Sequence, residues 1–153
     1  SPCWCGAGTP PAKMQSHPRI WRNNVWLGTS IATQADADKN IPELLKCRDL
    51  APVLFVSAEP LLGPINIGDA RPDWIITGGE SGPKARMCHT DWIREGVDIC
   101  RTNGIACFVK QLGGNALAAG RDQKYLIAMK DKKSGDPDEW PVDMRVREFP
   151  SAK

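Results

Sequence analysis

Four short apolar runs recur along the chain, and each one ends in small or polar residues. They cover residues 24–31, 53–58, 74–77 and 105–109. Continuous apolar runs of this length, rich in Val, Ile and Phe, are typical of strands that are buried on both faces of a parallel sheet. The pattern therefore predicts an α/β fold with four mainly parallel strands and helical or looped crossovers.

The segments between these runs differ in their helical potential. Thr33 can cap a helix that starts near Gln34, because its short side chain can accept a hydrogen bond from a free helical N–H. Pro42 is expected either to interrupt that helix or to begin a second turn at its first position. The connection 60–72 is rich in Gly and Pro, which predicts a looped crossover without an ordinary helix.

A second helix is predicted over residues 91–103. Thr90 is the expected N-cap, and Gly104 is the expected end of the helix. Apolar residues spaced by four and seven would form its buried stripe: Ile93, Val97 and Cys100. The helix would thus connect the third strand to the fourth, as a parallel sheet requires.

Polar residues follow the carboxyl ends of the four predicted strands. In parallel α/β folds these ends meet at one edge of the sheet, where sites are usually built. The candidate ligand-binding residues are Ser30, Ser57, Glu59, Glu80, Ser81, Lys110 and Gln111. Arg86 joins them as a loop residue that could reach the same edge, although loop arginines are more commonly solvated.

Each of these candidates has a structural alternative. Glu59 could accept hydrogen bonds from a ligand hydroxyl or amine, or it could cap backbone N–H groups of the loop that follows it. The glycine-rich segment 78–82 allows close approach of a ligand to the backbone, or it is simply a tight turn. Lys110 could neutralise a ligand carboxylate or phosphate, or it could pair with Glu59 or Glu80. The sequence leaves these alternatives open.

Composition sets the class of protein. The chain has 153 residues, 41% hydrophobic and 25% charged, with a net charge of +2, which is typical of a globular domain. Nucleic acid binding is not indicated by this charge balance. No apolar stretch approaches the roughly 18 residues that a membrane span needs, and no signal peptide is visible. A cytoplasmic location with mostly reduced cysteines is expected, and Cys100 and Cys107 are expected to pack as small hydrophobic residues.

A metal site is a weaker possibility. Cys88 and His89 together with Cys3 and Cys5 would complete a zinc ligand set by count. Neighbouring residues of an extended segment point in opposite directions, which disfavours Cys88 and His89 as joint ligands or as a catalytic pair. We therefore predict no metal site, and a small zinc-stabilised module remains a third hypothesis for the chain.

Three segments are expected. Residues 1–23 form an irregular lead-in, residues 24–114 form the α/β body, and residues 115–153 form a C-terminal extension that packs on the body. Apolar residues in the extension are expected to provide that packing: Trp140, Val146 and Phe149.

Several long motifs occur in the order found in a known family. They are NVWLGTS at 24–30, FVSAEPLLGP at 55–64, DWIITGGESG at 73–82 and FVKQ at 108–111, with DKKSG, EWP and RVR in the extension. Over about residues 24–150 the chain resembles the phage gp-thirty-seven/gp-sixty-eight family. The resemblance implies a TIM-like barrel related to radical S-adenosylmethionine enzymes. It also implies that S-adenosylmethionine and an iron–sulfur cluster serve the full-length members, in the cytoplasm of a bacterial host.

The chain departs from that family because it resembles only its C-terminal half. The cluster loop needs three closely spaced cysteine thiolates, whereas Cys3 and Cys5 stand in a C-x-C spacing with no third cysteine nearby. The expected fold is therefore half of a TIM-like barrel. The expected function is that of a phage-derived, non-catalytic remnant or binding protein, without a cofactor of its own. The alternative is the C-terminal half of a working enzyme that another chain completes.

Half of a barrel would leave its inner face uncovered. A closed barrel has no edge strands, but half of one has two edges. We therefore expect a homodimer, or a partner chain, to cover the open side.

Overall fold

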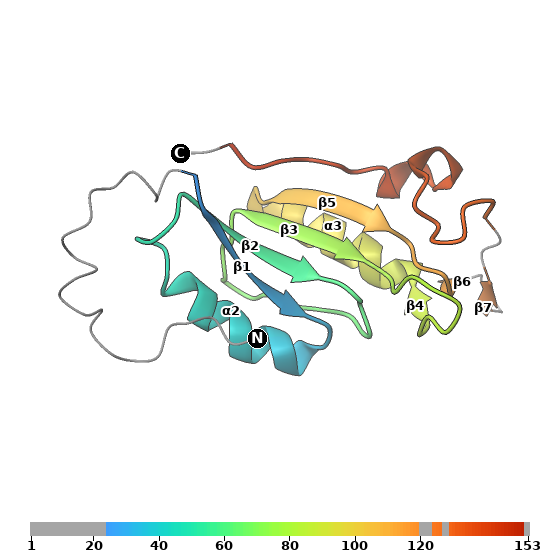
Figure 1. Ribbon diagram of the computed structural model, residues 1–153, viewed down its shortest axis with the longest axis horizontal. Helices are drawn as coiled ribbons and strands as arrows, with labels where there is room; N and C mark the ends of the chain where they lie inside the picture. The colour runs from blue at the N-terminus through green and yellow to red at the C-terminus, as the bar shows by residue number, and fades with distance from the viewer. Residues whose placement is uncertain (1–23, 120–123, 127–128, 152–153) are drawn as a thin grey trace.

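A four-stranded parallel sheet forms the centre of the molecule (Figure 1). The computed structural model describes residues 24–119, 124–126 and 129–151, so the lead-in 1–23 lies outside the described residues. The sheet has the order β1-β2-β3-β5, and every neighbouring pair is parallel. Its strands are β1 (Trp26–Ile31), β2 (Val53–Ala58), β3 (Trp74–Gly78) and β5 (Ala106–Gln111). This confirms the α/β prediction of four parallel strands, and the sheet is open and not closed into a barrel.

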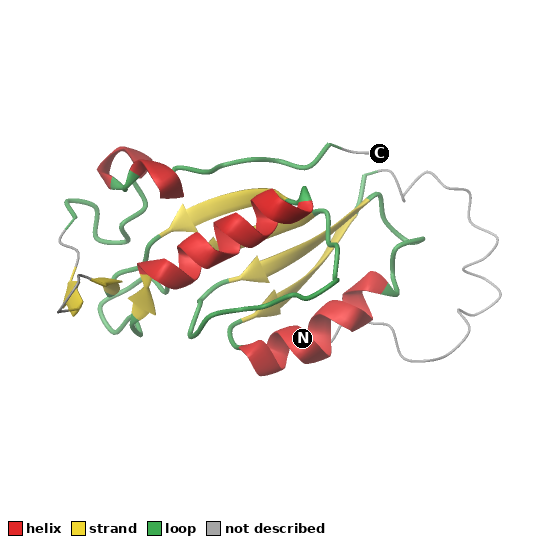
Figure 2. Cartoon of the chain, turned by 180° about the vertical axis from the view of Figure 1, so that it is seen from behind, coloured by secondary structure: helices red, strands yellow, loops and turns green. Residues whose placement is uncertain are grey.

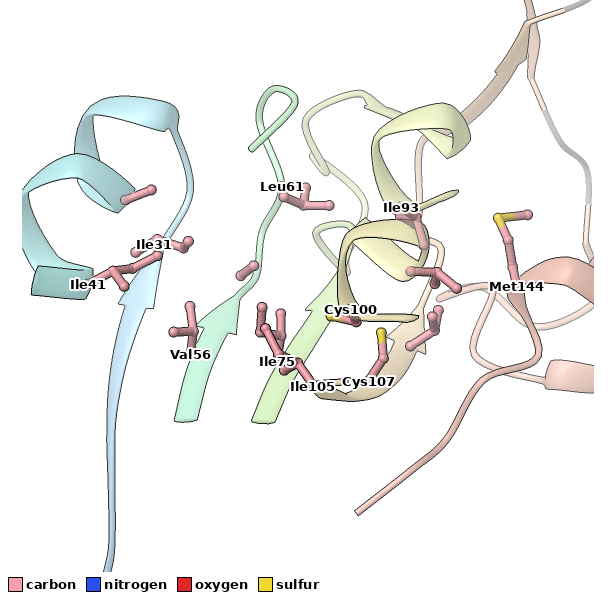
Figure 3. Packing of buried hydrophobic residues seen from close by; sticks show 14 of the residues in the cluster. Ile31, Ile41, Val56, Leu61, Ile75, Ile93, Cys100, Ile105, Cys107 and Met144 are labelled. Carbon is pink, nitrogen blue, oxygen red and sulfur yellow. The ribbon is translucent and has the colours of Figure 1, made fainter. Parts of the chain in front are cut away.

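Two helices cover one face of this sheet (Figure 2). They are α2 (Gln34–Leu45) and α3 (Thr90–Asn103). Their buried side chains and the strand residues on the same face form a continuous apolar core (Figure 3). Cys100 of α3 and Cys107 of β5 lie in this core as free thiols, as the sequence predicts. A hydrogen bond with the Cys107 thiol, together with burial among apolar side chains, raises the pKa of Cys100.

Helix α2 begins with the predicted cap. The Thr33 hydroxyl accepts a hydrogen bond from the Asp36 N–H, and the Asp36 carboxylate accepts one from the Thr33 N–H, which is a capping box. Pro42 lies inside one continuous helix, so the expected interruption there is wrong. The Pro42 carbonyl accepts a hydrogen bond from the Lys46 N–H, so helical hydrogen bonding resumes after the missing proline N–H.

Helix α3 starts one residue earlier than predicted. His89 is the N-cap, without a side-chain capping bond, and Thr90 is the first helical residue, so the prediction of a Thr90 cap is wrong. The Thr90 hydroxyl is buried and instead accepts a hydrogen bond from Arg94 one turn later. Gly104 ends the helix in a left-handed conformation with φ 64°, as predicted.

The crossover between β2 and β3 contains no helix, as its Gly and Pro content predicts. It crosses the helix-covered face between α2 and α3 (Figure 2). Its first residues are fixed to the carboxyl ends of two strands by backbone hydrogen bonds. The Leu61 N–H donates to the Gly78 carbonyl, and the Leu62 N–H donates to the Ala32 carbonyl. An apolar cavity of about 20 Å³ remains between this crossover, the sheet and α3.

A second, small sheet lies beyond the carboxyl end of the main sheet (Figure 1). Strand β4 (Cys88–His89) pairs in parallel with β6 (Ala116–Ala119), and β6 pairs antiparallel with β7 (Lys124–Leu126). The sequence did not predict this sheet, because strands of two to four residues have no measurable period.

Residues 129–151 of the C-terminal extension pack along β5 (Figure 1). It contains two short 3-10 helices, Pro137–Glu139 and Val142–Met144, and Trp140 and Met144 are fully buried. The indole N–H of Trp140 donates to the Ser134 carbonyl at 2.8 Å. Residues 146–148 then form backbone hydrogen bonds with Cys107 and Val109, so the outer edge of β5 is occupied by the chain itself.

The other face of the sheet carries aromatic rings instead of helices. Trp26, Phe55, Trp74 and Phe108 belong to the alternate strand positions that point away from the core. Trp74 is their centre: its ring centroid lies 5.8–6.0 Å from those of Trp26, Phe55 and Phe108. Phe149 of the extension joins the group at 5.3 Å from Trp74, and it remains 65% exposed. We call the side of the sheet that carries these rings the open face of the sheet.

Gly28 gives a test of this arrangement. A Cβ atom at position 28 would lie 2.4–2.6 Å from the Phe55 ring, whereas a Cβ at Gly63 would meet nothing within 4 Å. We expect Gly28→Ala to lower the free energy of unfolding by about 1–2 kcal/mol, because the ring must leave its contact with Trp74. Gly63→Ala is the control. Urea unfolding measures both, and equal stability of the two variants would show that the Phe55 ring does not lie over Gly28.

Candidate functional site

The predicted site lies where the strands of the main sheet end. Because all four strands are parallel, the residues that follow β2, β3 and β5 emerge at the same edge of the sheet (Figure 1). The expectation that Glu59, Glu80 and Lys110 share one end of the sheet is therefore met by the strand directions. Their side chains form two separate groups.

The first group joins the ends of β2 and β5. The Lys110 ammonium lies 3.1 Å from the Glu59 carboxylate. The Gln111 side-chain amide donates to the Gly79 carbonyl at 2.8 Å, and its approach to the Glu59 carboxylate is 3.4 Å. The structure thus brings together three of the predicted residues, which are 51 and 52 positions apart in sequence.

A bulge in β5 makes this group possible. Thr77 of β3 pairs with Val109, but Gly78 pairs with Gln111, so Lys110 is an extra residue in the register. Bulges of this kind redirect side chains. Consecutive residues Lys110 and Gln111 consequently both reach the same carboxylate, although neighbouring strand residues normally point to opposite faces.

Burial differs across the ion pair. The Glu59 side chain is 16% exposed, whereas the Lys110 side chain is 55% exposed. The carboxylate is therefore held in place by the fold, while the lysine can move into solvent. Ser57 precedes Glu59 on the same face of β2, and Ser30 lies beside Ser57 in the β1–β2 register. These two hydroxyls extend the polar surface toward β1.

The second group is an ion pair within one loop. The Glu80 carboxylate accepts hydrogen bonds from Nε and Nη2 of Arg86 at 2.9 and 2.8 Å, and also from the Arg86 backbone N–H. These hydrogen bonds, with the guanidinium charge, lower the pKa of Glu80 to about 2. Glu80 and Arg86 thus hold the loop 80–86 in shape, and Ser81 lies exposed within it.

The glycine-rich segment also has a structural role. A Cβ at Gly79 would lie 2.3 Å from the Leu112 carbonyl oxygen, and one at Gly113 would lie 2.9 Å from the Gly79 Cα. The Gly114 N–H donates to the Glu80 carbonyl at 2.8 Å. Two backbone segments therefore cross at a separation that only glycines permit. This contact accounts for Gly79 and Gly113 without a ligand.

Arg147 is a site residue that the sequence did not indicate. Its guanidinium donates to the backbone carbonyls of Val109, Lys110 and Gly135. It also lies 5.3 Å from the Phe108 ring centroid and 5.2 Å from that of Trp140. Arg147 thereby fixes the backbone of the bulge to the extension. Its place in the RVR motif was the available signal, but that motif alone did not connect it to β5.

The weak metal candidates do not form a ligand set within the described residues. Cys88 is buried, and burial raises the pKa of its thiol to about 12, which opposes the thiolate that zinc requires. The His89 ring packs 4.8 Å from the Trp92 ring. Across the described ranges no group of three or more His, Cys, Asp or Glu side chains is close enough to hold a metal ion. Cys3 and Cys5 lie outside those ranges.

Comparison with known proteins gives one match. A family model described as a protein of unknown function (DUF5131) matches residues 8–140. No curated protein and no solved structure matches the chain. In the described part of the chain no helix is long and apolar enough to cross a membrane.

The Glu80–Arg86 pair makes a prediction about titration. The pKa of Glu80 lies below its ordinary value of 4.5, so the pair stabilises the folded state above that pH, and the contribution is lost as the pH falls through about 2. We expect Arg86→Met to return the Glu80 midpoint toward 4.5, and the control Lys84→Met in the same loop to leave it unchanged. Carboxyl NMR titration measures the midpoint. A wild-type midpoint near 4.5 would contradict the pairing in solution.

Proposed function

The chain belongs to the DUF5131 family of proteins of unknown function, and we propose that it is a non-catalytic binding protein. In this proposal it descends from a phage family related to radical S-adenosylmethionine enzymes and retains the ligand site of half a barrel. The observation that carries the proposal is the group formed by Glu59, Lys110 and Gln111 at the carboxyl edge of the sheet. Parallel α/β proteins commonly bind small ligands at that edge.

The chemistry of the group indicates the class of ligand. Glu59 accepts hydrogen bonds from an amine or hydroxyl, and Lys110 attracts a carboxylate or phosphate. The Lys110 ammonium and the Glu59 carboxylate pair with each other, at 3.1 Å between Nζ and Oε1. A ligand that carries both an amine and an anionic group replaces each partner without leaving a charge unpaired, and the exposed Lys110 can move to admit it. We therefore propose small zwitterionic ligands of the amino acid type.

The iron–sulfur cluster of the related enzymes does not fit the residues that the structure describes. The free cysteines there are Cys88, Cys100 and Cys107, and all three are buried: Cys100 and Cys107 contact each other in the core, whereas Cys88 lies in the small sheet. A cluster needs three exposed thiolates on one loop. No step of a radical mechanism is therefore assigned to this chain.

A second candidate function rests on the open face. Trp26, Phe55, Trp74, Phe108 and Phe149 present aromatic rings on the side of the sheet that a closed barrel would bury. This exposure favours the alternative that another chain completes the barrel and supplies the cluster. The zinc-stabilised module has no comparable observation in its favour, and Cys3 and Cys5 lie outside the described residues.

The ligand proposal is tested with a defined panel of probes. Saturation-transfer NMR screens the twenty amino acids, S-adenosylmethionine and inorganic phosphate against the full chain, and calorimetry measures any affinity. We expect a zwitterionic probe to bind, and Glu59→Gln or Lys110→Met to weaken it about 10- to 100-fold, as the loss of a hydrogen bond to a charged group predicts. Lys46→Met is a matched control, because Lys46 pairs with Glu43 on the opposite side of the molecule. Absence of binding, or equal affinity in all variants, would refute the proposal.

The cluster prediction is tested independently. We expect anaerobic reconstitution of the isolated chain with iron and sulfide to give no [4Fe–4S] cluster and no cleavage of S-adenosylmethionine. Iron and sulfide quantitation provides the measurement. About four irons per chain, lost in the Cys3→Ser and Cys5→Ser variants, would instead support a catalytic role.

A further inference from the structure

The open face of the sheet is divided into an aromatic half and a polar half. Three of the four strand aromatics lie toward the amino ends of the strands, with Trp26 and Trp74 at the first positions of β1 and β3, whereas Phe108 is level with Ser57 in the register. Ser30, Ser57 and Lys110 occupy the carboxyl half of the same face. Any molecule that covers this face must therefore match apolar surface at one end and polar surface at the other.

The two edges of the sheet are not equivalent. The outer edge of β5 is hydrogen-bonded to residues 146–148 of the extension. Among the described residues, β1 has a strand neighbour only on its β2 side. Strand β1 (WLGTSI) contains no charged residue and no proline, which are the usual features that protect an exposed edge. On this side of the face Trp26 is 39% accessible, which is the greatest exposure among the rings of the four strands.

We propose that a second copy of this chain covers the open face through a two-fold axis that runs parallel to the strands between β2 and β3. Only this orientation places the aromatic half of one copy on the aromatic half of the other. With an axis perpendicular to the strands, Lys110 and Glu59 would instead lie against the amino ends of the partner's strands, where the face is most apolar, at a large desolvation cost.

Charge complementarity supports the same orientation. The axis exchanges β1 with β5 and β2 with β3, because the order of the sheet is β1-β2-β3-β5. In the register of the sheet Lys110 is level with the residue that follows β1, so it then lies opposite Ala32 of the partner subunit, and Glu59 lies opposite Gly78 of the partner subunit. Each charged strand end meets an uncharged one, so no like charges are brought together. The carboxyl edges of both copies lie at the same end of the dimer, so the two Glu59–Lys110 groups lie side by side at that end.

The available area sets the strength of this dimer. Four strands of five or six residues, spaced about 4.8 Å apart and rising about 3.3 Å per residue, give a face on the order of 400 Å². Two such faces bury about 800 Å² in total, less than the roughly 1,200–2,000 Å² of a standard stable interface. The proposal therefore predicts a dimer in the micromolar range and not a tight, permanent one. It holds whether or not the site binds a ligand.

Sedimentation velocity of the full chain from about 1 to 200 µM tests the proposal. We expect the mean mass to rise from that of a monomer to that of a dimer across this range. Hydrogen exchange at the two ends of the range locates the interface: slower exchange at high concentration is expected for residues 24–31, and unchanged exchange for α3, on the opposite face. A monomer throughout the range, or protection confined to the helices, would overturn the proposal.

A pair of lysine substitutions makes the test specific. Ser57 lies on the inner strand β2, in the carboxyl half of the open face, where it is partly solvent-accessible in a single copy and buried in the dimer. We expect Ser57→Lys to raise the dissociation constant at least tenfold, since a lysine would lose its hydration on association. Thr102→Lys places the same charge on the exposed side of α3 and should leave association unchanged. Thermal melting confirms that both variants fold, and an interface that tolerates Ser57→Lys would be a different one from that proposed.

Discussion

The structure depends on a parallel sheet that, among the residues the structure describes, has helices on one face only (Figure 2). Parallel sheets are normally buried on both faces, because each crossover places a helix or a loop against them. Here α2, α3 and the looped crossover all lie on the same side (Figure 2). The core is therefore one layer between the sheet and the helices, and the aromatic rings of the opposite face must be stabilised by contacts with one another and with Phe149. This asymmetry determines both where the candidate site lies and which surface remains available for association.

Much of this fold is predictable because the signals are long and local. The strands appear as unbroken apolar runs, Gly104 stops α3 in the left-handed conformation that glycine permits, and the Thr33–Asp36 capping box starts α2. The errors occur where a single residue was assigned a role without its surroundings. Thr90 has the chemistry of a cap, but its hydroxyl is turned inward to Arg94, and Pro42 is tolerated inside a helix. The small sheet of β4, β6 and β7 depends on contacts between distant, very short segments, which no local period reveals.

The candidate site was predictable as a location but not as a set of contacts. Parallel strand direction alone places Glu59, Glu80 and Lys110 at one edge. Lys110 pairs with Glu59 and not with Glu80 for two reasons. The bulge adds Lys110 to β5, and Glu80 already forms an ion pair with Arg86 of its own loop. The glycines of residues 78–82 show the same limit. A glycine-rich turn after a strand has the same sequence whether it approaches a ligand or another backbone, and here Gly79 crosses Gly113.

The C-terminal extension links these parts of the molecule. Its residues 146–148 occupy the edge of β5, its Arg147 holds the carbonyls of the bulge, and its Phe149 packs on the aromatic face. The extension therefore holds the Lys110 backbone through Arg147, and it does not cover the β1 side of the same sheet. A segment that packed only as a cover would be placed over Trp26, the most exposed ring of the four strands, yet this segment lies at the opposite edge of the sheet. Its contacts are those of a support for the site, and the surface at β1 is left for another molecule to bury.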